Sequence, residues 1–136
     1  MFKNILVAND GSEYGNKSVD LAIDLAVKYD SKISALYVMD FASDLSYDEL
    51  DDEGGAILDK ITAKGNEAGV TVVEHIITAN PVNDMETMIR KINPDIVVIG
   101  AHGTTYDKNQ EATVSKIGSV AKNALRVSKV TIILVK

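Results

Sequence analysis

Two pairs of small residues, separated by a polar segment, are the feature of this sequence best suited to chemistry. Gly100 and Gly103 flank His102 directly after an apolar run, and Gly118-Ser119 opens a segment with helical spacing. A residue without Cβ lets the backbone approach a ligand closely, and a helix start offers unpaired N–H groups at the positive end of its dipole. The pattern is therefore compatible with a phosphate cradle. It is equally compatible with a tight strand exit followed by a loop end.

A second polar group, Asn9-Asp10-Gly11-Ser12, follows the first apolar run. The Asp10 carboxylate could accept hydrogen bonds from a ribose or contact a metal, but the same four residues could equally form a turn that caps the next helix. His102 could reach a phosphate or a metal, although a single histidine in a loop more often bonds to water or to its neighbours. Residue type alone leaves both alternatives open.

The segment 11–18, "GSEYGNKS", is a second candidate phosphate loop. Lys17 and Ser18 stand at the P-loop distance from Gly11, and "LYVMD" resembles a Walker B strand. The P-loop pattern needs glycine directly before the lysine, where this chain has Asn16. An ordinary first helix after a turn is therefore the favoured interpretation.

Apolar periodicity predicts strands that alternate with helices along the whole chain. The predicted strands are residues 5–8, 32–40, 70–77, 96–100 and 130–135. The predicted helices are residues 12–30, with Ser12 as N-cap, 56–69, 81–92, with Pro81 in its first turn, and 118–128. The acidic segment 41–54 is expected to be a loop with at most one helical turn.

This alternation predicts an α/β fold with a parallel sheet covered by helices on both faces, in one domain spanning residues 1–136. Crossovers should be right-handed, whereas periodicity does not determine the strand order. In open sheets of this kind, ligands bind outside the carboxyl ends of the strands where the winding reverses. If strands 5–8 and 96–100 are neighbours, both polar groups face one crevice.

Composition excludes several classes of function. The chain is 46% hydrophobic, but no apolar run approaches the length of a membrane span. With no cysteine, it has no disulfides or thiolate sites, and we expect a cytoplasmic protein. The net charge of −6, without clustered Lys or Arg, argues against nucleic acid and membrane partners. We expect residues 47–53 to be a solvated charge run and His75 to be a packing or edge residue.

Four segments together resemble the universal stress protein family: "NILVANDGSEYGNKSVDLAIDLA", "LYVMD", "PDIVVIGAHG" and "IGSVAKNALRVSKVTIILVK". The resemblance covers nearly the whole chain, with the pieces in the same order. It implies an open five-stranded parallel sheet in the order 3-2-1-4-5, a Rossmann-like adenine-nucleotide-binding fold. That order places strands 5–8 and 96–100 side by side.

The ATP-binding branch of that family carries Gly-x-x-Gly, nine residues, and then Gly-Ser or Gly-Thr. By this resemblance, Asp10 would contact adenosine, Val38 would offer its backbone to the adenine edge, and Gly100 would approach the ribose. Ala8 and Asn9 would line the base pocket. The phosphate end would be formed by Gly103, Gly118, Ser119 and Val120, with His102 beside them.

This chain departs from the family pattern in one respect. Fourteen residues, 104–117, separate the two glycine motifs instead of nine. Lengthening a surface loop costs little free energy, so the segment could fold outward or lie across the phosphate site. Tyr106, Asp107 and Lys108 are its notable residues, and nothing assigns them a role. Ala8 also stands where the binding branch often has Pro or Val.

The resemblance implies ATP binding, with Mg²⁺ or Mn²⁺ on the phosphates, by a regulatory or sensory module of a stress response. Fast phosphoryl transfer needs a positioned Lys or Arg, a held metal and an oriented nucleophile. We predict no catalytic residue and at most slow ATP hydrolysis. One alternative is a nucleotide-independent stress protein that acts through protein partners. A homodimer through strand 130–135 fits both hypotheses, and a P-loop NTPase is the third.

Overall fold

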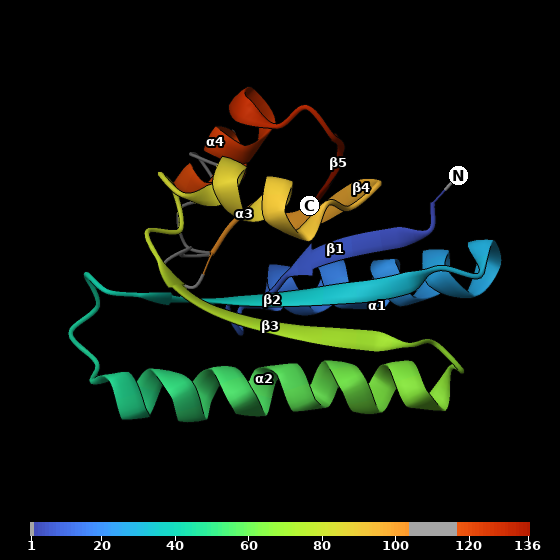
Figure 1. Ribbon diagram of the computed structural model, residues 1–136, viewed down its shortest axis with the longest axis horizontal. Helices are drawn as coiled ribbons and strands as arrows, with labels where there is room; N and C mark the ends of the chain where they lie inside the picture. Colours follow the sequence, from blue (N-terminus) through green and yellow to red (C-terminus); the bar gives the residue numbers. More distant parts are fainter. Residues whose placement is uncertain (1, 104–116) are drawn as a thin grey trace.

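The computed structural model describes residues 2–103 and 117–136, which form a parallel sheet and four helices (Figure 1). The strands are β1 (Asn4–Ala8), β2 (Lys32–Asp40), β3 (Val72–Ala79), β4 (Ile96–Gly100) and β5 (Thr131–Val135). The helices are α1 (Glu13–Tyr29), α2 (Tyr47–Glu67), α3 (Met85–Ile92) and α4 (Ser119–Val127). None of the helices in these residues has both the length and the apolar character that crossing a membrane requires.

The strand order is β3-β2-β1-β4-β5, which confirms the predicted α/β fold. Strand β1 is central: Val7 pairs with Ala35 of β2 and with Val98 of β4. Helices α1 and α2 cover one face of the sheet, and α3 and α4 cover the other. The helices that follow β1 and β4 therefore lie on opposite faces.

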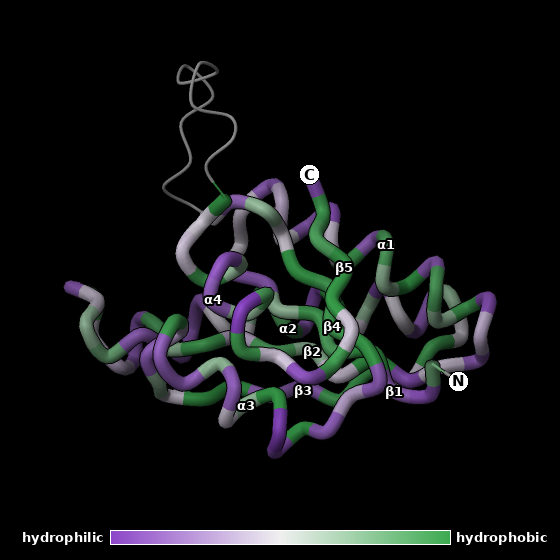
Figure 2. Tube along the Cα trace, turned by 90° about the horizontal axis from the view of Figure 1, so that it is seen from above, coloured by the Kyte–Doolittle hydropathy of each residue, from purple (hydrophilic) through white to green (hydrophobic). Residues whose placement is uncertain are grey.

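Two apolar clusters, one on each face, hold the layers together. Ile5 and Val7 pack toward α1 and α2, whereas Leu6, between them, packs toward α3 and α4. All three side chains are fully buried, as expected for a parallel sheet covered on both faces. Figure 2 shows hydrophobic residues along β4 and β5 and hydrophilic residues recurring along the outer helices.

The predicted loop over residues 41–54 is wrong, because α2 begins at Tyr47. Ser46 Oγ accepts a hydrogen bond from Glu49 N (3.2 Å), and Glu49 Oε2 accepts one from Ser46 N (3.0 Å). This capping box satisfies two N–H groups at the helix start. Gly54 of this helix is buried, and a Cβ there would lie 2.3 Å from the Tyr37 ring. It brings α2 close to β2.

The predicted helix start at Pro81 is also wrong, because residues 81–84 form a turn and α3 begins at Met85. Asn80 Oδ1 accepts hydrogen bonds from the backbone N–H groups of Val82 and Asn83, at 2.9 and 2.8 Å. Asparagine side chains commonly compete with helices for backbone donors in this way. The other predicted element ends lie within two residues of the observed ones, and His75 lies on the edge strand β3, as predicted.

Asp95 ties the start of β1 to the turn before β4. Its Oδ2 accepts hydrogen bonds from Asn4 N at 2.8 Å and from Lys3 N at 2.7 Å. These two backbone bonds, first that of Asn4 and then that of Lys3, lower the pKa of the Asp95 carboxyl group. A carboxylate that is bound in the folded state adds stability above its unfolded pKa, and this contribution is lost as the pH falls through the folded pKa.

We predict that Asp95→Ala lowers the free energy of unfolding by roughly 1 kcal/mol at pH 7. The difference from the wild type should shrink as the pH falls below about 4, where the carboxylate of the unfolded chain takes up its proton, and should be lost once the pH has passed the lower pKa of the folded state. Urea unfolding at several pH values from 2.5 to 7 measures this. Asp95→Asn keeps an acceptor oxygen but has no charge to titrate, so it is the matched control. A difference that is constant over the whole range would contradict the prediction.

Candidate functional site

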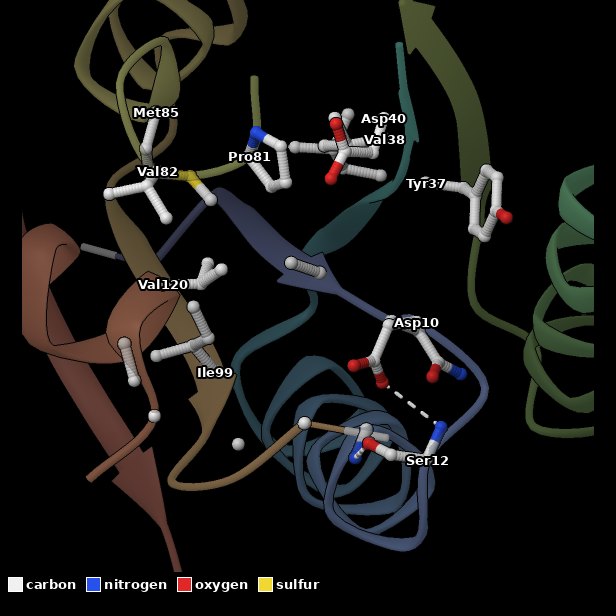
Figure 3. A pocket seen from close by; sticks show the side chains of 18 of the residues that line it. Asp10, Ser12, Tyr37, Val38, Asp40, Pro81, Val82, Met85, Ile99 and Val120 are labelled. Carbon is white, nitrogen blue, oxygen red and sulfur yellow. Dashed lines mark hydrogen bonds between the residues drawn. The ribbon is translucent and has the colours of Figure 1, made fainter. Parts of the chain in front are cut away.

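A cavity of about 600 Å³ opens at the carboxyl edge of the sheet, where β1 and β4 end side by side. Figure 3 shows it with its walls formed by segments from β1, β2, β4, α4 and the turn after β3. All ten residues that the sequence singled out line this one cavity: Ala8, Asn9, Asp10, Val38, Gly100, His102, Gly103, Gly118, Ser119 and Val120. The structure thus brings the two polar groups of the sequence together, as neighbouring strands require.

The loop after β1 is held by its own side chains. Asn9 is buried; its Oδ1 accepts from Gly11 N (2.8 Å) and its Nδ2 donates to Asn16 Oδ1 (3.2 Å). Asp10 Oδ1 accepts from Ser12 N at 3.0 Å (Figure 3). Its second oxygen, Oδ2, lies 3.1 Å from where a Cβ on Gly103 would be. Asp10 is therefore both a turn residue and part of the cavity wall that spans β1 and β4.

The segment 11–18 does not have the form of a P-loop. Helix α1 begins at Glu13, with Ser12 as the predicted N-cap accepting from Gly15 N. Lys17 forms an ion pair with Glu13 (3.7 Å) and lies over the Tyr14 ring. A P-loop must turn its backbone N–H groups toward a phosphate, whereas these residues are helical. The structure therefore favours the interpretation as an ordinary first helix.

Gly100 has a packing role besides lining the cavity. A Cβ there would lie 2.8 Å from Tyr14 Cβ and 3.0 and 3.1 Å from the Tyr14 carbonyl carbon and oxygen. The missing Cβ thus lets α1 pack against the end of β4. The Tyr14 ring then meets the His102 ring edge-on, with centroids 4.8 Å apart. The contact of Gly100 with a ribose stays a prediction.

Gly118 begins α4 beside the loop that follows β4. Its N–H donates to Ala101 O at 2.7 Å, and Ala101 N donates to Val135 O at 2.8 Å. The N–H of Gly118 is therefore already paired. Gly118, the N-cap residue of α4, has no side chain with which to cap the helix. The positive end of α4 is therefore presented by the N–H groups of Ser119 and Val120, because residues at a helix start have no acceptor one turn earlier in the helix.

One wall of the cavity is apolar, and most of it was missed by the sequence analysis. Pro81, Val82 and Met85 line it from the turn after β3 and the start of α3, and Val120 lines it from α4. Val38 was predicted as a backbone contact, but its side chain also belongs to this wall. The signal that could have identified Pro81 and Val82 is their position directly after a strand that neighbours β2.

Comparison with known proteins agrees with this geometry. The sequence pattern of the universal stress protein family matches residues 1–136. The chain belongs to this family. It is 25% identical over 146 residues to Universal stress protein MJ0531 of Methanocaldococcus jannaschii, covering 100% of this chain and 83% of that protein. It is 24% identical over 153 residues to Universal stress protein YxiE of Bacillus subtilis, with both chains fully covered.

Solved structures of universal stress proteins share the fold. UspA from Lactobacillus plantarum superposes with a TM-score of 0.81 at 20% identity, over 99% of this chain and 98% of that one. Two others contain adenine nucleotides. The Archaeoglobus fulgidus protein in complex with dAMP has a TM-score of 0.75 at 18% identity, over 99% and 98% of the two chains. An Arabidopsis thaliana family protein with AMP bound has a TM-score of 0.71 at 18% identity, over 98% and 91%.

The charges around this universal stress protein cavity are unusual for a phosphate site. Asp10, Asp40 and Glu53 line it, and no Lys or Arg does among the residues that the structure describes. Burial, followed by the Glu53 carboxylate that accepts from its hydroxyl at 3.2 Å, raises the pKa of Tyr37 to about 12. Tyr37 therefore stays neutral across the physiological range.

Nothing in the described part of the chain forms a group of three His, Asp or Glu residues that could hold a metal. Residues 47–53 lie in α2 with most side chains exposed to solvent, in agreement with the predicted solvated charge run. The segment 104–116, with Tyr106, Asp107 and Lys108, lies outside the described residues, so the outward and site-covering alternatives both stay open.

We predict that Gly100→Ala lowers the free energy of unfolding by roughly 1–3 kcal/mol, because its methyl group meets the Tyr14 backbone rather than a flexible side-chain end. Chemical unfolding measures this. The matched control is Gly55→Ala in α2, where a Cβ meets nothing within 4 Å, and where the helix should become more stable by about 0.5–1 kcal/mol. Equal stability of Gly100→Ala and the wild type would contradict the packing role.

Proposed function

We propose that this universal stress protein binds ATP together with a divalent cation in the cavity between β1 and β4, and acts as a regulatory or sensory module in a stress response. The observation that carries the proposal is the convergence of the ten predicted residues on one cavity. Its volume of about 600 Å³ lies within the range of small-molecule sites. The adenine nucleotides in the two family structures support the same ligand class.

The two ends of the cavity suit the two ends of a nucleotide. The apolar wall, with Pro81, Val82 and Val120, is suited to a flat base, and Asp10 is placed to accept hydrogen bonds from a ribose. The start of α4 is suited to an anion, since Ser119 and Val120 present N–H groups at the positive end of the helix. The roles of Asp10, Ser119 and the Val120 N–H follow the family resemblance, whereas the role of Pro81, Val82 and the Val120 side chain is inferred from the lining of the cavity.

A divalent cation fits this proposal as a partner of the phosphates. Mg²⁺ commonly keeps several waters and binds through one or two carboxylates and the substrate phosphates. In the described part of the lining, Asp10 is the carboxylate closest to the glycine motifs, through its Oδ2 beside Gly103. The cation would neutralise phosphate charge where no lysine or arginine of the described lining can. We assign no catalytic residue, in keeping with a binding module that hydrolyses ATP slowly at most.

A second candidate is a nucleotide-independent homodimer that acts through protein partners. The observation behind it is the position of β5 at the edge of the sheet, where Ile132, Ile133, Leu134 and Val135 are only partly buried. Exposed apolar edge strands tend to pair with another chain. Sedimentation analysis of the wild type with and without nucleotide would separate a dimer that needs ATP from one that does not.

We predict that nucleotide-free protein binds Mg-ATP with roughly micromolar affinity at about one site per chain, measured by calorimetry. At 100 times the dissociation constant, the ligand should raise the free energy of unfolding by about 2.7 kcal/mol. If millimolar Mg-ATP produces no heat of binding and no thermal stabilisation, the proposal is refuted. The nucleotide-independent dimer then remains as the explanation.

Two variants distinguish this site from the P-loop alternative. Gly118 has φ −57°, which any residue adopts, and a Cβ there would make ordinary contacts of 3.4 to 3.6 Å. Gly118→Val should therefore fold, while its extra methyl groups beside Gly103 weaken Mg-ATP binding by at least about tenfold. Lys17→Ala, on the outer side of α1, should leave the affinity unchanged. The reverse pattern would support a P-loop.

A further inference from the structure

Asn123 connects α4 to the opposite wall of the cavity. Its Nδ2 donates a hydrogen bond to the backbone oxygen of Val82, 41 positions earlier in the chain. Residues three apart lie on neighbouring positions of a helix surface, so Asn123 follows Val120, which lines the cavity, by one turn. One helix thus supplies a cavity side chain and also holds the segment that faces it.

Arg126 fixes the orientation of the Asn123 amide. The Arg126 Nη2 donates to Asn123 Oδ1 at 2.9 Å. Arginine has donors only, and a backbone oxygen is an acceptor only. The amide oxygen must therefore face Arg126 and the amide NH₂ group must face Val82, because the reverse orientation would lose both hydrogen bonds.

The turn that contains Val82 is otherwise held by bonds within itself. Asn80 Oδ1 accepts from the N–H groups of Val82 and Asn83, and Asp84 Oδ2 accepts from Asn80 N at 2.8 Å. These bonds define the shape of the turn but not its distance from α4. Among the side-chain hydrogen bonds of the described residues, that of Asn123 joins the turn to α4.

We propose that Asn123 is a positioning residue that sets the width of the apolar part of the cavity and thereby its affinity for the base. Figure 3 shows Val82 and Met85 on one side of this part and Val120 on the other. A gap of 0.5–1 Å on one side of a packed group forfeits roughly a quarter to a half of its dispersion energy. The inference rests on the proposed function, because it assumes that the base lies against this wall.

The test is calorimetric titration of the wild type and of Asn123→Ala with two probes, adenosine and Mg-ATP. If Asn123 positions the base wall, both affinities should fall by the same factor, about three- to tenfold. The ratio of the adenosine and Mg-ATP dissociation constants, which reports the phosphate end, should stay unchanged. Lys122→Ala, an exposed neighbour on α4, is the matched control and should leave both affinities at the wild-type level.

Further variants separate positioning from general stability. Asn123→Asp has the same shape but no donor for Val82 O, so it should bind adenosine as weakly as Asn123→Ala. Asn123→Gln keeps a donor and should recover part of the affinity. Arg126→Ala releases the amide oxygen and should give a smaller loss in the same direction, which keeps the test available if Asn123→Ala does not fold.

Each outcome bears on the inference. Lower thermal stability with unchanged adenosine affinity would overturn it, and so would a fall in Mg-ATP affinity alone, because the effect would then belong to the phosphate end. If the wild type binds neither probe, the proposed function fails and this inference fails with it. If the wild type binds both and Asn123→Ala binds them equally well, only the inference fails.

Discussion

The side-by-side pairing of β1 and β4 is the constraint on which the rest of the site depends. Strand β1 is central, and the order β3-β2-β1-β4-β5 makes the winding of the chain reverse at this pair. The helix after β1 then covers one face and the helix after β4 covers the other. Two chain segments that leave adjacent strands in opposite directions must open a crevice between them. The polar loops of Asp10 and His102 line it for this reason.

The glycines at the crevice have different physical roles, although they look alike in the sequence. Gly100 lacks a Cβ because α1 packs against it through Tyr14, whereas a Cβ on Gly118 would meet only ordinary contacts. A Cβ on Gly103 would lie 3.1 Å from the Asp10 Oδ2 atom. A glycine motif can therefore contain glycines that helix packing requires, such as Gly100, and glycines that packing does not require, such as Gly118. The structure distinguishes the two kinds at each position.

Much of the fold could be predicted from the sequence because β1, β4 and β5 are almost continuously apolar and the strands alternate with amphipathic helices. The order of the strands came from the family resemblance, since periodicity carries no information about neighbours. The start of α2 was missed because the acidic composition of residues 41–54 suggested a loop, although Ser46 and Glu49 have capping-box spacing. The start of α3 was placed too early because the Asn80 side chain takes the backbone donors that a helix would use.

The predicted site residues reached one cavity because they follow two adjacent parallel strands, which local sequence can indicate. Most of the apolar wall could not be found in this way. Val38 and Val120 were expected at the site from the family resemblance, but Pro81, Val82 and Met85 were not, since single aliphatic residues look the same whether they line a core or a cavity. Only the tertiary arrangement distinguishes the two. The Asn123 bond to Val82 is a contact of the same kind, since nothing in local sequence connects residues 41 positions apart.

The backbone of Ala101 connects the β5 edge of the sheet to the crevice through two hydrogen bonds. Its N–H bonds to Val135, the last residue of β5, and its oxygen bonds to Gly118 at the start of α4. Ala101 therefore stands between the edge strand and the helix start, one backbone hydrogen bond from each. Any energetic coupling between β5 and the start of α4 through these two hydrogen bonds is reciprocal. If a ligand at the start of α4 strengthens the pairing of β5 with another chain, that pairing must raise the affinity for the ligand by the same factor.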